Sequence, residues 1–182
     1  MRQNDRLSRT VRAAVLLAVA LVLPFVTGQI PQIGKALCPM HLPVLLCGFF
    51  CGPQYGLLVG LVAPLLRFAL FGMPTIVPTG VIMSMELAAY GLVSGLCWRL
   101  LPRRRASAYL SLILAMIAGR VIWGVMHVIF FLLGESEFGW MAFAAGAFLN
   151  AIPGIVLQLV VIPLLVMKFG QQFETGKRER ST

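Results

Sequence analysis

The sequence predicts an all-α membrane protein with six transmembrane helices and both termini in the cytoplasm. Composition is the first reason, because 59% of the 182 residues are hydrophobic and 12% are charged, with a mean hydropathy of +0.91. Soluble domains carry about 25% charged residues, so this chain needs lipid around it. The other reasons are long apolar stretches and basic residues placed between and beyond them. The net charge of +9 therefore indicates membrane topology rather than nucleic-acid binding.

Four apolar stretches each predict one helix: 13–26, 78–98, 109–133 and 140–167. A crossing needs about 20 helical residues, so the first stretch must use its flanks. The region 44–71 is harder to assign, since one helix of that length would reach about 42 Å. The stretch "GPQYG" at 52–56 also interrupts it with glycine and proline. This region forms either one broken span or two short ones.

The positions of the basic residues favour two short helices. Twelve of the 15 basic residues lie in three segments: Arg2, Arg6, Arg9 and Arg12; Arg99, Arg103, Arg104 and Arg105; Lys168, Lys177, Arg178 and Arg180. Two short spans place all three segments on one side of the membrane, as the positive-inside rule requires. We therefore expect a single membrane domain with short helices 2 and 3. It comprises a basic cytoplasmic segment 1–12, a six-helix bundle 13–167 and a cytoplasmic tail 168–182.

Polar residues inside the spans predict a binding site. Ionisable groups are costly in lipid and usually face a cavity or a partner. The predicted helices 78–98 (helix 4), 109–133 (helix 5) and 140–167 (helix 6) each contain such residues at helical spacing. They are Glu86 and Tyr90; Arg120, Trp123 and His127; Asn150 and Gln158. We expect them to converge in a small polar chamber. Two arginines, Arg67 and Arg120, against one Glu86 favour an anionic ligand.

A structural interpretation of the same residues stays open. Glu86 and an arginine can neutralise each other between helices, and asparagine or glutamine can hold helices together by hydrogen bonds. Arg67 lies near a helix end, where its side chain can reach the interface.

The stretch "LCPMHLPVLLCGFFCG", residues 37–52, has cysteines and a histidine that suggest zinc ligands. Cys47 and Cys51 fall inside short helix 2, where cysteine behaves as a small apolar side chain. We therefore expect no metal site. His41 precedes the helix and is expected in the extracellular loop over the chamber.

Known catalytic motifs such as G-x-S-x-G and H-E-x-x-H are absent from the sequence. We therefore expect no catalytic residues. Ala14 and Ala18 in helix 1, and Gly56 and Gly60 in helix 3, form small-x-x-x-small pairs that let another helix approach closely.

Several of these features resemble one family, the substrate-binding S components of energy-coupling factor (ECF) vitamin transporters. They are the six helices, the helix 1 alanines, "MHLPVLLCGFFCGPQYGLLVGLVAPLLRFALFG" across helices 2 and 3, and "PTGVIMSMELAAYGLVSGL" in helix 4. The resemblance extends from residue 13 to about 165.

The resemblance implies a subunit that captures a micronutrient in a pocket of helices 4 to 6 and the outer loops. It implies docking through helices 1 to 3, with Ala14, Ala18, Gly56 and Gly60 as the docking residues, onto a membrane coupling subunit driven by two cytoplasmic ATPases. The chain itself would then hold no cofactor, since its partners hydrolyse ATP. The substrate-binding candidates are His41, Arg67, Glu86, Tyr90, Arg120, Trp123, His127, Asn150 and Gln158.

The excess of arginine makes pantothenate the first expected substrate, with folate or a flavin nucleotide behind it. Only Tyr90 and Trp123 are obvious stacking residues, which disfavours a large fused ring. A neutral pyridoxine-like or queuosine-type precursor remains possible. The alternative functions are an ion-coupled small-solute transporter, or a membrane-embedded enzyme using Glu86, His127 and Arg120.

Overall fold

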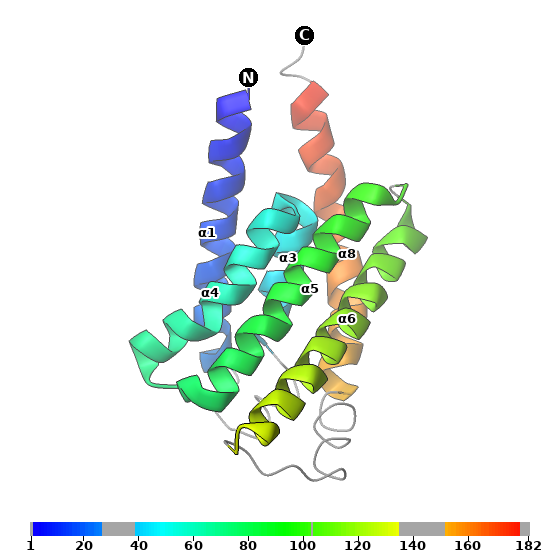
Figure 1. Ribbon diagram of the computed structural model, residues 1–182. Coiled ribbons are helices and arrows are strands. Elements are labelled where there is room, and N and C mark those ends of the chain that lie inside the picture. Colours follow the sequence, from blue (N-terminus) through cyan, green and yellow to red (C-terminus); the bar gives the residue numbers. More distant parts are fainter. Residues whose placement is uncertain (1, 27–38, 103, 135–151, 179–182) are drawn as a thin grey trace.

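The computed structural model describes residues 2–26, 39–102, 104–134 and 152–178. Their helices are α1 (Arg2–Val26), α3 (His41–Cys51), α4 (Pro53–Phe71), the short π-helix η1 (Ile76–Gly80), α5 (Val81–Leu100), α6 (Arg105–Leu132) and α8 (Ile152–Arg178). Figure 1 shows that α1 begins and α8 ends at the same end of the bundle. The predicted all-α membrane architecture is confirmed.

Five helices in the described ranges are long and apolar enough to cross a membrane: Asn4–Phe25, Pro53–Phe71, Ile76–Leu100, Arg105–Leu132 and Ile152–Phe169. The apolar helix α3 has 11 residues, so at 1.5 Å per residue it is about 16 Å long. It is about half as long as the hydrocarbon core is thick, so it is shorter than the full crossing predicted for helix 2.

The predicted division of 44–71 into two helices is confirmed. Gly52 separates α3 from α4 with φ of 104°, a backbone conformation that favours glycine. Its N–H donates to the carbonyl oxygens of Cys47 and Gly48 at 3.2 and 3.1 Å, which completes the end of α3.

Two helix ends differ from the predicted boundaries. Helix α1 begins at Arg2 rather than residue 13, and α8 continues to Arg178 rather than ending at 167. Arginine, lysine and glutamine are good helix formers, so a helix does not stop where the hydrocarbon core ends. The first part of predicted helix 6, residues 140–151, lies outside the described residues.

The three helices α3, α4 and α5 pack through glycines, and we call this contact the glycine seam: Gly48, Gly56, Gly60, Gly91 and Gly95. A methyl group added at Gly91 would overlap the Gly56 carbonyl, and one at Gly60 would overlap the Leu87 carbonyl. The seam corrects one interpretation, because Gly56 and Gly60 face α5 rather than an external partner. A small-x-x-x-small pair indicates a close approach but not which helix approaches.

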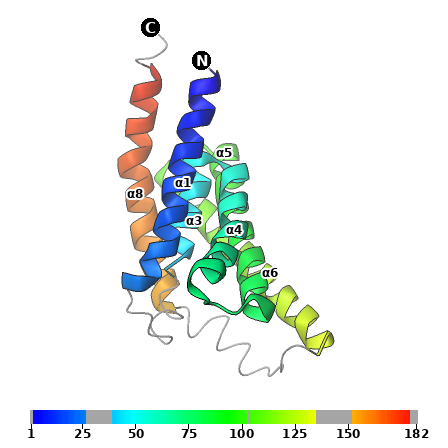
Figure 2. The same ribbon diagram turned by 90° about the vertical axis from the view of Figure 1, so that its left-hand side faces the viewer.

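The remaining helices surround this seam. Helix α1 packs on α3 and α4 (Figure 2), α6 packs on α5, and α8 packs on α3 and α6. Large apolar side chains point outward from α6 and α8: Val121, Val125, Val128, Val156, Val160 and Leu164. An apolar outer face is what a bundle in lipid requires.

Candidate functional site

Three helices bring a histidine, a carboxylate and a guanidinium together. His41 is the first residue of α3, Glu86 lies in the second turn of α5, and Arg120 lies in the C-terminal half of α6. The Oε1 atom of Glu86 is 3.4 Å from Arg120 Nη1 and 3.6 Å from His41 Nε2. We call His41, Glu86 and Arg120 the polar cluster.

The polar cluster is buried and incompletely hydrogen-bonded. The side chains of His41, Glu86 and Arg120 are 6%, 4% and 16% exposed. Although these groups form ion pairs, both ring nitrogens of His41 and Oε1 of Glu86 make no hydrogen bond with favourable geometry among the described residues. Buried polar atoms without hydrogen bonds cost free energy, so they are where a polar ligand or water would bind most favourably.

The ring of Tyr90 forms one wall of the polar cluster. Tyr90 lies one helical turn after Glu86 on α5, and its ring meets the His41 ring edge-on at a centroid distance of 5.1 Å. Gly119 on α6 makes room for it, because a methyl group there would lie 2.8 Å from Tyr90 Cζ. Sequence reasoning missed this glycine, whose only signal is its position directly before Arg120.

Trp123 and His127 extend the site along α6. Their rings are 3.9 Å apart at 43°, and Nδ1 of His127 donates to the Trp123 carbonyl oxygen at 3.0 Å. The Arg120 guanidinium carbon is 6.0 Å from the Trp123 ring centroid. Five predicted residues on α5 and α6 therefore form a continuous surface: Glu86, Tyr90, Arg120, Trp123 and His127.

His41 occupies a different place from the one predicted. It was expected in a loop over the chamber, but it begins α3 and is buried, with 4% of its surface exposed. Helix α3 begins at His41, before the predicted start of the apolar region at residue 44, because Leu42 and Pro43 are also part of the helix. His41 therefore belongs to the interior wall of the site.

The structure places Arg67 away from the polar cluster. Its Nη1 donates to the Leu21 carbonyl oxygen of α1 at 3.1 Å, and its guanidinium carbon lies 5.5 Å from the Phe25 ring centroid and 5.9 Å from that of Phe71. Arg67 thus joins α4 to α1. The excess positive charge predicted from two arginines is therefore wrong for this site.

The two candidates from helix 6 have different outcomes. Gln158 is buried on α8, with 3% of its surface exposed. Asn150 lies outside the described residues.

Comparison with known proteins identifies the family. The family model "ECF transporter, substrate-specific component" matches residues 8–166, which is most of the chain. The chain belongs to this family. No curated protein and no solved structure gives a significant match.

Family membership determines the class of protein. ECF S components are subunits of transporters, so this chain is a multi-pass membrane protein of a transport system and not an enzyme. The interpretation of Glu86, His127 and Arg120 as an acid, a base and a clamp is therefore set aside.

The two helix 1 alanines lie on the outside of the S component. Ala14 and Ala18 are exposed on α1, beside the exposed side chains of Val11, Val15 and Val22. These five residues form one continuous apolar stripe along the helix, which we call the α1 stripe.

Proposed function

We propose that this S component is the high-affinity substrate-capture subunit of an ATP-driven importer, and that it binds its substrate at the polar cluster. The observation that carries the proposal is the convergence of His41, Glu86 and Arg120 from three helices around a buried carboxylate oxygen. The ring nitrogens of His41 and Oε1 of Glu86, which lack hydrogen bonds, would gain them from a ligand.

The polar cluster pairs one guanidinium with one carboxylate, so it suits a small polar molecule with several hydrogen-bonding groups, one of which Arg120 would bind as an anion. The Arg120 guanidinium can bind a carboxylate, the Glu86 carboxylate accepts hydrogen bonds, and the two ring nitrogens of His41 offer further hydrogen-bonding positions. Pantothenate, with one carboxylate, two hydroxyls and an amide, has these groups and remains the first proposed substrate. Folate and flavin nucleotides come behind it, because the aromatic surface is limited to Tyr90, Trp123 and His127.

The proposed partners are a membrane coupling subunit and two cytoplasmic ATPases. The α1 stripe is the proposed docking surface, because small residues beside branched apolar ones let a second helix approach closely in lipid. ATP would be hydrolysed by the partners, and this chain would hold no cofactor.

The first experiment identifies the substrate. The full chain is purified from cells in mild detergent, denatured, and its small molecules are identified by mass spectrometry. A stoichiometric carboxylated vitamin supports the proposal, with pantothenate expected. A ligand without any anionic group would contradict the role given to Arg120.

The second experiment tests the site with matched arginine variants. Arg120→Ala removes the anion partner and leaves Glu86 without its cation, so the Kd for the identified ligand should rise at least about 100-fold. Arg67→Met also removes an arginine from a membrane-spanning helix but leaves the polar cluster intact, so the Kd of this variant should change less than about threefold. Equal loss in both variants would contradict the site.

The third experiment tests docking. Replacing Ala14 and Ala18 with leucine should abolish co-purification of the coupling subunit and transport, while ligand binding to the isolated S component stays unchanged. Retained transport in the double variant would contradict the docking surface.

A further inference from the structure

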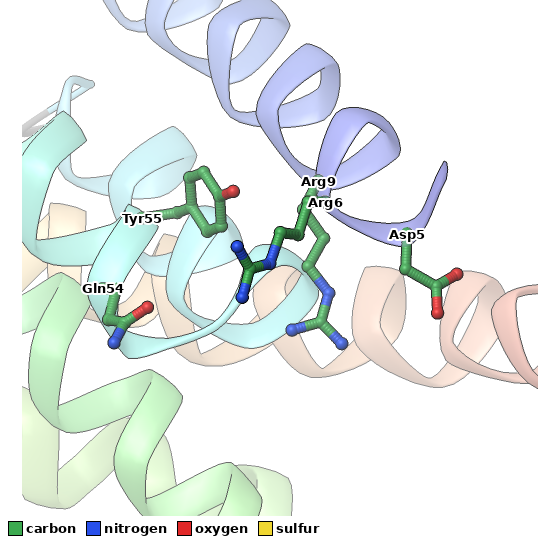
Figure 3. A pocket seen from close by; sticks show the side chains of 5 residues that line it. All are labelled: Asp5, Arg6, Arg9, Gln54 and Tyr55. Atoms are coloured by element: carbon green, nitrogen blue, oxygen red, sulfur yellow. The ribbon is translucent and has the colours of Figure 1, made fainter. Parts of the chain in front are cut away.

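A second polar region lies at the opposite end of the bundle from the polar cluster. A cavity of about 460 Å³ opens between the first turns of α1 and the start of α4. It is lined by Asp5, Arg6, Arg9, Gln54 and Tyr55 (Figure 3). None of these residues belongs to the proposed substrate site. The volume is within the range of pockets that hold small molecules.

The cavity carries a net positive charge. Arg6 and Arg9 are exposed, lie three residues apart on α1, and have no ion pair with a carboxylate in the described part of the chain. Figure 3 shows both side chains leaving α1 toward the start of α4. Asp5 is the one acidic residue of the lining. Two cations against one anion make the cavity a site for an anionic group.

The walls of the cavity are held in place. The hydroxyl groups of Thr10 on α1 and Tyr55 on α4 form a hydrogen bond of 3.1 Å, which joins the two helices directly beside the arginines. Gln54 adds an amide that can donate to an anion. The cavity is therefore a built feature of the α1–α4 contact.

The depth of the cavity corresponds to the headgroup layer. Phe25 lies near the far end of α1, and at 1.5 Å per residue Arg6 stands about 28 Å from it along the helix axis. The hydrocarbon core is about 30 Å thick, so Arg6 reaches the polar layer at the end that carries the basic segments. One turn deeper on α4, the exposed side chain of Leu58 follows Gln54 on the same helix face.

We propose that this cavity binds the phosphate headgroup of an anionic phospholipid from the leaflet at the basic end of the bundle. The two guanidinium groups and Gln54 would hold the phosphate oxygens, and Leu58 would contact an acyl chain. Basic pockets between helices at this depth suit such headgroups. The depth of the arginines and the exposed Leu58 favour a lipid over a soluble phosphate, which has no acyl chain to place there.

The test measures lipid binding to the full chain purified in detergent, by native mass spectrometry with short-chain lipids. Phosphatidylglycerol should bind at least about tenfold more tightly than phosphatidylcholine, because only the former is a net anion. Each arginine should contribute about fivefold, so Arg6→Gln with Arg9→Gln should weaken phosphatidylglycerol about 25-fold. The matched pair Arg104→Gln with Arg105→Gln removes equal charge at the same end outside the cavity, and should change binding less than twofold.

Four outcomes would overturn the proposal. They are equal binding of the two lipids, equal weakening by the two arginine pairs, and displacement of the lipid by equimolar inorganic phosphate. The fourth is unchanged lipid binding in the Arg6, Arg9 variant together with loss of the coupling subunit, which would assign the arginines to a protein contact. Both arginines are exposed, so the variant should fold, and an unchanged thermal transition checks this.

Discussion

The glycine seam and the polar cluster lie on the same helix, α5, yet they hold its neighbours in opposite ways. At the seam, Gly91 lets the backbones of α4 and α5 meet with no side chain between them. Tyr90, the residue before Gly91, and Glu86, about one turn earlier, instead reach toward α3 and α6 with long side chains. Backbone contacts cannot change shape without moving a helix, whereas side chains can change rotamer. The seam therefore provides a rigid frame, and the polar cluster is the part that can adapt to a ligand.

Breaking the seam should have the largest effect. Gly91→Ala places a methyl group into the Gly56 carbonyl, where no side chain can give way, and should destabilise the fold by about 3 kcal/mol or more. The measurement is unfolding in mixed detergent followed by circular dichroism. Gly72→Ala is the matched control, since its methyl group meets nothing within 4 Å and its left-handed φ of 70° costs about 1 kcal/mol. Similar losses in the two variants would argue against backbone contact as the source of rigidity.

Breaking the polar cluster should have the next largest effect on stability. Arg120→Ala leaves the buried Glu86 carboxylate without its guanidinium and should cost about 3 kcal/mol. Adding Glu86→Gln removes the unpaired charge, so the double variant should recover most of that loss. Unfolding of the single and double variants in the same detergent measures both. If the double variant were as unstable as Arg120→Ala, the two side chains would not be coupled.

The sequence predicted which polar residues of α5 and α6 lie together, but it wrongly added Arg67 of α4 to them. Glu86, Tyr90, Arg120 and Trp123 lie close together, as helical spacing of intramembrane polar residues predicted. Arg67 was assigned to the same site, but the rotation of α4 about its own axis turns this side chain toward Leu21 and Phe25 of α1. That rotation depends on how the seam packs, which hydropathy does not report.

The same limit applies to the small and basic residues. Gly56 and Gly60 were read as a docking face, and only the packing of α4 against α5 shows them to be internal. Arg6 and Arg9 were used for topology alone, since nothing in the sequence places Gln54 and Tyr55 beside them. The helices and their number follow from apolar length and charge, but contacts between helices require the structure.

The smallest effect on stability is expected at Gly119, the glycine beside the polar cluster. Because the glycine seam also depends on a glycine, Gly91, the two alanine variants compare the two regions directly. Gly119→Ala directs a methyl group at the Tyr90 ring, 2.8 Å from Cζ, and a ring can shift where a backbone cannot. The variant should lose only about 1 kcal/mol of stability, well below Gly91→Ala. The displaced ring would press on His41, so the affinity for the identified ligand should fall about tenfold, which binding assays at equal folded fraction can measure. If Gly119→Ala lost as much stability as Gly91→Ala with no change in affinity, the Tyr90 side would be as rigid as the seam.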